Sequence, residues 1–367
     1  MSKHPQFASP AAAADAFLAP GQAVGRYLLG RNEHAAALLD IPAIAALVDG
    51  IIDDRATEPA WRGKPVLRGE QVAAPALAVN CSMSISPVSA ARRLAALGFA
   101  PLHYADLLEA RPDLVPAPPF VAEMRADLAA HANEWAALAE RLADDASRAV
   151  LRDLVAYRGS AHPRHMAGYT VRFDEQYFEP FMPLHGETFV DAGGFDGDTT
   201  EQFCRRDPAY RGVILFEPSG ANIARARERL AGRPNIRFEE MGVSDAPGTL
   251  SFDPHAGSAS AVSSSGTVSI AVTTIDEAVS EPVSFIKMDL EGWEMRALAG
   301  AARHIRADHP KLAIAVYHSA ADFRHIPAYI LGLRDDYAVY LRHYSEGWSE
   351  TVMFFVPRTR RDTLQDQ

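Results

Sequence analysis

TFVDAGGFDGDTTEQF, residues Thr188–Phe203, is the stretch that decides how the second half of this chain folds. Its apolar residues Phe189–Val190 lead into Asp191, which predicts a short buried strand that ends in an acid. The glycines that follow let the backbone approach a ligand closely and adopt positive φ; they are Gly193, Gly194 and Gly197. Residues 199–202 predict the first turn of a helix, where free N–H groups and a partial positive charge favour an anion. The stretch therefore predicts a cradle for a charged ligand.

The bulk composition is that of an ordinary globular protein large enough for two domains. The chain has 367 residues, of which 48% are hydrophobic and 23% charged. Its net charge of -11 argues against a general nucleic-acid binder, which needs Lys and Arg to neutralise phosphates. Two cysteines, Cys81 and Cys204, make neither a disulfide framework nor a zinc motif. No segment reads as a signal peptide or a membrane span, so we expect a cytoplasmic protein.

The first part of the chain predicts a loose arm over residues 1–20 and a smaller accessory α/β (Rossmann-like) domain over residues 21–111. Short apolar runs predict strands at 27–30, 50–54, 77–80 and 99–104, with helices at 32–39 and 87–97. The turn after the first strand lacks the glycine pattern that seats a pyrophosphate, and Asp53 alone does not replace it. We therefore favour a structural or partner-binding domain over a second nucleotide site.

Residues 112–184 predict a helical and aromatic-rich connector. It begins with the proline-rich segment 112–119, and helices are expected over 120–142 and 144–157, the second with Asp144 as its N-cap. Aromatic residues recur from Tyr169 to Phe181, just before the cradle. They fit a substrate lid and ordinary core packing equally well.

Residues 185–358 predict a second, stronger α/β pattern, with a tail over 359–367. Strands are expected at 188–191, 213–216, 236–239, 285–288 and 312–316, and helices at 199–206, 221–230 and 293–304. A serine- and glycine-rich surface loop is expected over 257–266. Two β-rich runs, 338–344 and 350–356, predict a C-terminal hairpin that closes the sheet edge. The fold class is therefore α/β, with a Rossmann-like doubly wound sheet and a C-terminal β-hairpin.

The strand ends decide the ligand, because doubly wound sheets bind ligands outside the carboxyl ends of their strands. Glu217 follows the second strand, where a carboxylate can accept hydrogen bonds from both ribose hydroxyls. NAD and S-adenosylmethionine share that ribose, so Glu217 alone does not choose between them. Phe195 takes the place of the middle glycine of the dinucleotide pattern, which disfavours NAD. S-adenosylmethionine has no phosphate; Asp191 is placed to hold its ammonium, and the N–H groups around Thr199 its carboxylate.

Several of these motifs together resemble the FkbM family of S-adenosylmethionine-dependent methyltransferases. The matching segments are FVDAGGFDGDTT at 189–200, FEP at 216–218, FIKMDLEGWEMRAL at 285–298, KLAIAVYH at 311–318, YLRHY at 340–344 and ETVMFF at 350–355. The resemblance covers about the second half of the chain, and many members have Asn where this chain has Phe195. It implies O-methylation of a hydroxyl on a saccharide, glycan or related biosynthetic intermediate, with a small-molecule or glycan acceptor.

The resemblance also implies positions for the cofactor-binding residues. Glu217 resembles the ribose acid, and Ser244 with Asp245 falls where the adenine is usually bracketed. Asp289 and Glu291 end the fourth strand, beside the sulfonium. The full set of expected cofactor-binding residues is Asp191, Gly193, Gly194, Phe195, Asp196, Gly197, Thr199, Glu217, Pro218, Ser219, Ser244, Asp245, Asp289 and Glu291.

A hydroxyl acceptor needs a base within hydrogen-bond reach. His318 at the end of the fifth strand is the first candidate, Asp289 the second and His343 the third. Asp289 and Glu291 could instead hold Mg²⁺, but they lack a clear third ligand, so we favour a site without metal. Lys287 fits either a carboxylate partner or a side chain that reaches out from its strand.

Two other functions stay open at this point. An NAD-linked oxidoreductase would use the same sheet, and a non-catalytic module would bind the cofactor or a partner, the latter through the N-terminal domain. The acceptor and the oligomeric state are not encoded in these motifs.

Overall fold

The computed structural model describes residues 4–21, 23–252 and 268–358. The chain divides into two compact units, each built from segments that are separate in the sequence. Unit 1 comprises Met1–Ala130, Leu151–Val171 and Tyr344–Ser349, and unit 2 comprises His131–Val150, Arg172–His343 and Glu350–Gln367. The expected loop at 257–266 and the tail at 359–367 lie outside the described residues.

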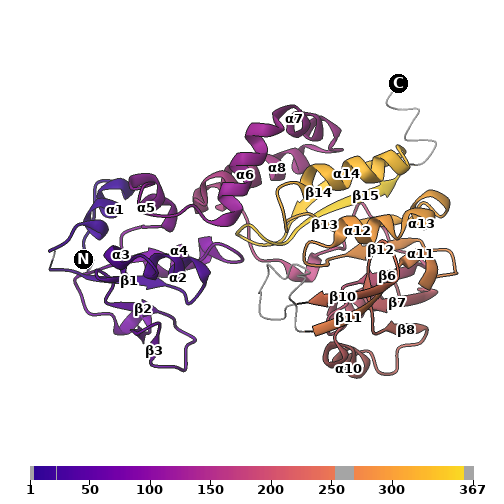
Figure 1. Ribbon diagram of the computed structural model, residues 1–367, viewed down its shortest axis with the longest axis horizontal. Coiled ribbons are helices and arrows are strands. Elements are labelled where there is room, and N and C mark those ends of the chain that lie inside the picture. Colours follow the sequence, from indigo (N-terminus) through magenta and orange to yellow (C-terminus); the bar gives the residue numbers. More distant parts are fainter. Residues whose placement is uncertain (1–3, 22, 253–267, 359–367) are drawn as a thin grey trace. The chain divides into compact units, whose positions relative to one another are not determined.

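Unit 1 contains a five-stranded sheet in the order β3-β4-β2-β1-β5 (Figure 1). Strands β1, β2, β4 and β5 are parallel and β3 is antiparallel to β4, so the expected α/β pattern is present. The strands are β1 Gly25–Leu29, β2 Gly50–Ile52, β3 Ala60–Trp61, β4 Lys64–Leu67 and β5 Ala76–Asn80. The helices of this part are α1 Pro10–Leu18, α2 Glu33–Leu39, α3 Pro42–Ala45, α4 Pro87–Ala96, α5 Tyr104–Ala110 and α6 Pro119–Ala130.

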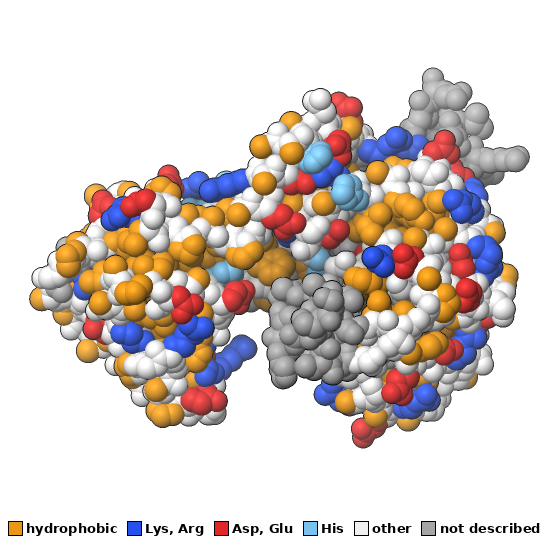
Figure 2. Space-filling view, viewed as in Figure 1, with side chains coloured by type: hydrophobic (Ala, Val, Ile, Leu, Met, Phe, Trp, Pro, Cys, Tyr) orange, Lys and Arg blue, Asp and Glu red, His pale blue; other side chains and the backbone are white. Residues whose placement is uncertain are grey.

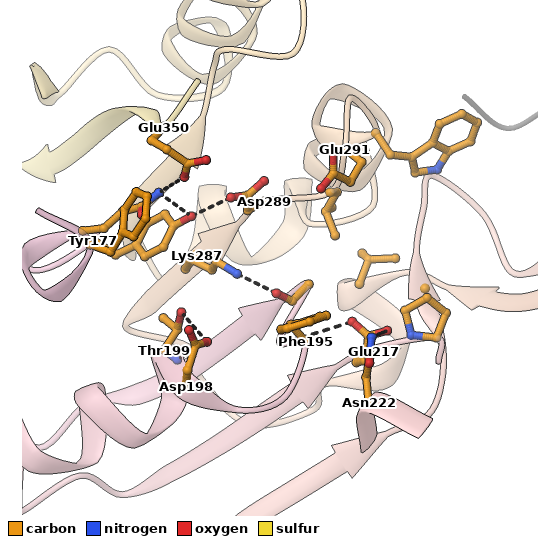
Figure 3. A pocket seen from close by; sticks show the side chains of 18 of the residues that line it. Tyr177, Phe195, Asp198, Thr199, Glu217, Asn222, Lys287, Asp289, Glu291 and Glu350 are labelled. Atoms are coloured by element: carbon orange, nitrogen blue, oxygen red, sulfur yellow. Dashed lines mark hydrogen bonds between the residues drawn. The ribbon is translucent and has the colours of Figure 1, made fainter. Parts of the chain in front are cut away.

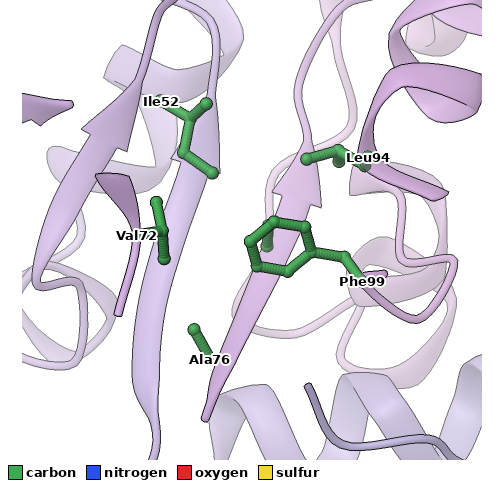
Figure 4. Close-up of a cluster of buried hydrophobic side chains, with 6 residues drawn as sticks. Ile52, Val72, Ala76, Leu94 and Phe99 are labelled. Atoms are coloured by element: carbon green, nitrogen blue, oxygen red, sulfur yellow. The ribbon is translucent and has the colours of Figure 1, made fainter. Parts of the chain in front are cut away.

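One face of this sheet is covered by a buried apolar cluster (Figure 4). Ile52 from β2 and Ala76 from β5 contribute from the sheet, and Leu94 of α4 and Phe99 pack against them. The apolar runs that predicted the strands are therefore the ones that this core buries.

The predicted strand at 99–104 is wrong. Within that run only His103 pairs with a strand, through an isolated bridge to Asn80. The helix α5 begins at Tyr104 because His103 is its N-cap and the carboxylate of Asp106 accepts the His103 backbone N–H at 2.7 Å. A helix-capping signal thus outweighs the short apolar run.

The predicted helix over 120–142 is interrupted at His131, which separates α6 from α7 (Ala132–Arg141). Helix α8 (Asp145–Ser160) begins as expected, with the Asp144 carboxylate accepting the Ser147 backbone N–H at 2.8 Å. The proline-rich segment 112–119 lies within unit 1.

The loop Tyr344–Ser349 belongs to unit 1, although it joins two strands of unit 2. Its buried Glu346 accepts hydrogen bonds from the backbone N–H and the hydroxyl of Ser89, both at 2.6 Å, in the first turn of α4. A Cβ on Gly347 would lie 2.0 Å from the Ser84 carbonyl oxygen, so only glycine fits there. The loop is therefore an integral part of unit 1.

Unit 2 contains a seven-stranded sheet in the order β14-β15-β13-β12-β6-β7-β8. Strands β13, β12, β6, β7 and β8 run parallel, and β15 pairs antiparallel with both β13 and β14. The predicted C-terminal hairpin is confirmed as β14 and β15, with β14 at the edge. The strands are β6 Thr188–Ala192, β7 Gly212–Phe216, β8 Ile236–Glu239, β12 Phe285–Met288, β13 Lys311–Ala315, β14 Tyr337–His343 and β15 Thr351–Pro357.

The helices of unit 2 pack in two groups, α9 with α10, and α11 to α14 among themselves. The predicted helix at 293–304 is two short helices, because the chain breaks at Gly300. Besides α7, which contacts α14, the helices are α9 Asp198–Arg206, α10 Gly220–Arg229, α11 Ile275–Ala278, α12 Glu294–Ala299, α13 Ala302–Ala307 and α14 Asp322–Leu333.

A second, three-stranded sheet in unit 2 was not predicted from the sequence. Its order is β10-β11-β9, with β9 Gly242–Val243, β10 Gly248–Phe252 and β11 Val268–Thr273. Among the described residues, no helix is both long and apolar enough to cross a membrane. On the face of unit 2 seen in Figure 2, acidic and basic side chains are interspersed.

Candidate active site

A pocket of about 610 Å³ lies in unit 2 where strands β6, β7 and β12 end. Its lining comes from the segments that the sequence placed at the strand ends, and from three others: residues 173–177, the small sheet β9–β11, and Glu350 (Figure 3). This is the position at which doubly wound sheets bind ligands.

The glycine loop after β6 is held against its neighbours with no room for side chains. Gly193 has φ +80°, and a Cβ there would lie 2.0 Å from the Asp289 carbonyl oxygen. A Cβ on Gly194 would lie 2.3 Å from Leu215, and both glycine N–H groups donate to the Phe216 carbonyl. Gly197 has φ +82° and is the N-cap of α9. Gly193 and Gly194 therefore serve close packing between β6, β7 and the segment after β12, whereas Gly197 packs against α10.

Phe195 sits in this loop with φ +45° and is 54% exposed. Its N–H donates to the Glu217 carboxylate at 3.2 Å, and the Arg225 guanidinium lies 5.5 Å from its ring centre. Phe195 lines the pocket, whereas the neighbouring Asp196 forms an ion pair with Arg229 at 2.6 Å and does not. Asp196 thus holds the loop in place, and its position does not support the predicted role in contacting the cofactor.

Glu217 lines the pocket at the end of β7 and is 8% exposed. Burial raises its pKa, while hydrogen bonds from Ser219, Asn222 and Phe195 act in the opposite direction. Pro218 also lines the pocket, and Ser219 caps α10 instead. Asn222, one turn into α10, lines the pocket beside Glu217 and was not predicted (Figure 3).

Asp191 does not line the pocket. It is fully buried, 3.1 Å from the Lys287 ammonium, and accepts a hydrogen bond from Thr200 at 2.7 Å. The prediction that Asp191 holds a ligand ammonium is therefore not supported by its position. The same ion pair shows that Lys287 has a carboxylate partner, which was the first of our two interpretations of this residue. Its ammonium also donates to the Gly193 carbonyl at 2.7 Å.

The first turns of α9 supply polar groups in place of Asp191. Asp198, Thr199 and Gln202 line the pocket. Within the described residues the buried Oε1 of Gln202 has no hydrogen-bond partner. A buried acceptor left unpaired is costly, so it points to a donor supplied by a ligand. No motif in the sequence marked Gln202.

The small sheet β9–β11 gives the pocket an apolar wall made of Val243, Leu250, Ile270 and Val272, with Trp293 beside it. The predicted adenine residues Ser244 and Asp245 lie just behind this wall and do not line the pocket. Ser244 accepts a hydrogen bond from the Trp293 indole at 3.2 Å. The predicted adenine residues are thus within one or two positions of Val243, which does line the pocket, but they are polar residues that do not.

The opposite part of the pocket is lined by acids and aromatic residues (Figure 3). Asp289 accepts hydrogen bonds from the Tyr177 phenol at 2.6 Å and from the Tyr317 phenol at 3.3 Å. Burial raises the pKa of both phenols well above its usual value, so they remain donors at neutral pH. Tyr177 and Phe173 line the pocket, whereas Phe181 stacks on Tyr340, so the aromatic segment serves both as pocket wall and as core.

Glu350 lines the pocket immediately before β15, and its carboxylate accepts the Gln176 amide N–H at 2.9 Å. Gln176 in turn donates to the Tyr177 hydroxyl at 3.1 Å. Neither Gln176 nor Glu350 was predicted as a site residue. The only sequence signal for Glu350 is its place directly before the apolar run of β15.

His318 lies behind the pocket wall among three carboxylates, and does not line the pocket. Its ring nitrogens lie 3.1 Å from Glu294, 3.5 Å from Glu291 and 3.6 Å from Asp289. Burial alone would lower its pKa, but these carboxylates outweigh burial and raise the pKa to about 11. An imidazolium at neutral pH takes up no proton, so this environment argues against His318 as the base. His343 is buried beside Thr351 and also does not line the pocket.

Asp289, Glu294 and His318 also offer ligand atoms within 4.8 Å of one another, the spacing of a metal site. However, Glu294 faces one ring nitrogen and Asp289 the other, so no single nitrogen is shared closely by both acids. Glu291, the second ligand considered from the sequence, is half exposed and also lies beside His318. We therefore assign no metal to the cluster of Asp289, Glu294 and His318.

The parallel sheet, the glycine loop and an acid at the end of β7 fit a methyltransferase of the S-adenosylmethionine-dependent class. Residues 191–340 match the methyltransferase FkbM domain. Among curated proteins, none matches the chain.

One solved structure shows the same fold over nearly the whole chain, and two others are similar over about half of it. The methyltransferase FkbM from Methylobacillus flagellatus has 23% sequence identity and a TM-score of 0.73, with 95% of this chain and 96% of that chain covered. An rRNA methylase from Streptococcus thermophilus, 16% identical, has a TM-score of 0.33 over 48% of this chain and 90% of its own. Fibrillarin from Aeropyrum pernix with bound S-adenosylmethionine, 12% identical, has a TM-score of 0.31 over 50% of this chain and 71% of its own.

The residues present fit S-adenosylmethionine. Glu217 and Asn222 offer polar groups for ribose hydroxyls, the β9–β11 wall offers an apolar face for an adenine, and the unpaired Gln202 oxygen can accept from an ammonium. Gly193 of the packed loop lines the pocket.

Proposed function

We propose that this chain is an O-methyltransferase that uses S-adenosylmethionine to methylate a hydroxyl of a saccharide, glycan or related biosynthetic intermediate. The observation that carries the proposal is the two-sided pocket. One side has Glu217 and the apolar wall suited to a nucleoside, and the other has Asp289, Glu291, Glu350 and Tyr177.

The acid- and tyrosine-rich side supports a polyhydroxyl acceptor. Carboxylates accept hydrogen bonds from hydroxyl groups, and tyrosine offers both a ring face and a polar tip. When bound, S-adenosylmethionine supplies an electrophilic methyl group on a sulfonium. The protein's own part is to hold an acceptor oxygen in line with that methyl group and to take up its proton.

Two further expectations remain proposals. The two cysteines are free and buried, which supports our prediction of a cytoplasmic protein. A partner that binds through unit 1 is kept as a prediction, and its sheet shows no glycine pattern for a second nucleotide.

Calorimetric titration of the purified protein with S-adenosylmethionine, S-adenosylhomocysteine and NAD, each with and without EDTA, tests the cofactor. We expect both adenosyl ligands to bind, NAD not to bind, and EDTA to change neither result. Transfer of a radiolabelled methyl group to a panel of hydroxylated sugars then tests the acceptor. Binding of NAD alone would reject the proposal in favour of an oxidoreductase.

A further inference from the structure

Glu350 occupies an unusual position in the acceptor side of the pocket. It lies between the unit 1 segment that ends at Ser349 and the first residue of β15, and its φ is +70°. A non-glycine residue in this region of backbone space is disfavoured, and such residues cluster at active sites where their surroundings enforce them. The backbone therefore holds this carboxylate in the pocket against a local conformational preference.

Two other pocket carboxylates, Glu217 and Asp289, are more heavily engaged. Glu217 accepts three hydrogen bonds from nitrogen donors. Asp289 accepts from two phenols and adjoins His318. Within the described residues, Glu350 accepts one hydrogen bond, from Gln176 to one of its two oxygens. Of these three carboxylates, Glu350 thus keeps the most capacity to accept a proton from a bound molecule.

The charges that face Glu350 come from several elements. Asp289 after β12, and Glu291 beyond it, oppose its ionisation, while His318 after β13 and the Gln176 amide favour it. The phenols of Tyr177 and Tyr317 are near enough to feel its charge. Burial, the largest cause, together with Asp289 raises the pKa of Glu350 to about 7. A base with a pKa near the working pH is the most effective kind.

We propose that Glu350 is the catalytic base of this methyltransferase, and that binding of the cationic methyl donor displaces a proton from its carboxyl group. The inference rests on the proposed function. A positive sulfonium in the same pocket favours the ionised form of a neighbouring carboxylic acid, because an opposite charge stabilises the carboxylate. The neutral thioether product has no such effect.

The step balances in protons and electrons. The acceptor's O–H proton passes to the Glu350 carboxylate, and the acceptor oxygen forms a bond to the methyl carbon. The electron pair of the broken carbon–sulfur bond stays on sulfur, which becomes a neutral thioether. Glu350 ends the step protonated, which is the form that its acidic surroundings favour once the sulfonium charge is gone.

Proton release on donor binding tests the inference without an acceptor. The wild-type protein is titrated at pH 7 with S-adenosylmethionine and with S-adenosylhomocysteine, each in buffers of low and high ionisation enthalpy. The difference in heat between buffers gives the number of protons exchanged. With a pKa of about 7, about half of the Glu350 groups carry a proton, so binding of the donor should release up to about 0.5 proton more than binding of the product.

The same titrations with Glu350→Gln assign this proton. The free ligands are identical in both experiments, so proton exchange on their own amino groups cancels between wild type and variant. We expect the extra release to disappear in Glu350→Gln and to persist in Glu350→Asp. Glu281→Gln, which removes a carboxylate outside the pocket that pairs with Arg237, is the matched control and should retain it.

The outcomes separate the inference from the proposed function. If neither adenosyl ligand binds the wild-type protein, the proposed function fails and the inference fails with it. If both bind and the wild type releases no extra proton, Glu350 is not the group we infer, while the cofactor assignment stands. The same conclusion follows if Glu350→Gln still releases the proton. The wild-type comparison remains decisive even if the variant does not fold.

Discussion

Replacing Gly193 by alanine should damage the cofactor loop in a way that the structure makes calculable. At φ +80° an L-residue costs roughly 1–2 kcal/mol relative to glycine. The new Cβ would lie 2.0 Å from the Asp289 carbonyl oxygen, and forcing an extra methyl group into packed structure costs about 1–3 kcal/mol. Alanine also reduces the conformational entropy of the unfolded chain, which offsets the loss of stability by about 0.4–1 kcal/mol. The net loss of stability is therefore about 1–5 kcal/mol.

Gly232 provides a matched control for this prediction. Its φ is +81°, but a Cβ there would meet nothing within 4 Å. Gly232→Ala carries the same conformational cost without the clash, so the difference between the two variants should be about 1–3 kcal/mol. Urea unfolding of both variants measures this difference, and calorimetry should show weaker S-adenosylmethionine binding only for Gly193→Ala. Equal stabilities within about 0.5 kcal/mol would refute the claim that the loop is pressed against the end of β12.

Three other substitutions test separate parts of the structure. Glu217→Ala should weaken S-adenosylmethionine binding about 10- to 150-fold for each ribose hydrogen bond lost, as measured by calorimetry; unchanged affinity would remove its assigned role. His318→Gln should flatten the dependence of stability on pH. The folded pKa of about 11 exceeds the unfolded value of roughly 6.5, so the stability from His318 is complete below pH ~6.5 and is lost as pH rises towards 11. Urea midpoints at pH 6.5 and 9.5 should therefore differ more for the wild type than for the variant, and equal slopes would reject the imidazolium assignment. Glu346→Ala should lower the stability of unit 1 by about 0.5–2 kcal/mol through loss of the α4 cap, and an unaltered melting curve would contradict this.

The strands of unit 2 were predictable because their sequences are short apolar runs that are buried on both faces. β6, β7, β12 and β13 all appear where the runs at 188–191, 213–216, 285–288 and 312–316 placed them. The glycine loop and Glu217 could be located for the same reason, since each directly follows such a strand. Position relative to a strand end is local information, and a sequence contains it.

The roles of charged side chains were harder to predict because they depend on partners distant in the sequence. Asp191 looked available for a ligand, but Lys287 lies 3.1 Å away on the neighbouring strand. The sequence suggested His318 as a base, but the fold places the carboxylates of Glu291 and Glu294 beside its ring. Glu350 acquires its setting from Gln176 and from Asp289. A titratable residue therefore needs the folded environment before a role can be assigned.

Secondary structure was mispredicted where polar capping competed with apolar patterning. His103 and Asp106 start a helix inside the run that suggested a strand. The sheet β9–β11 was not predicted because its strand β9 has only two residues and therefore shows no periodic pattern.

The loop Tyr344–Ser349 also constrains the order in which this protein can be completed during its synthesis. Most of unit 1 precedes unit 2 in the chain, yet unit 1 includes six residues that leave the ribosome only after most of unit 2 has been made. Until then the first turn of α4 lacks the Glu346 carboxylate, and the Met83 carbonyl lacks the Trp348 N–H. N-terminal domains generally fold first as the chain emerges. Here unit 1 is incomplete until Tyr344–Ser349 has been synthesised. Unit 1 of a ribosome-bound chain that ends at Val171 should therefore be more accessible to protease than unit 1 of the full chain.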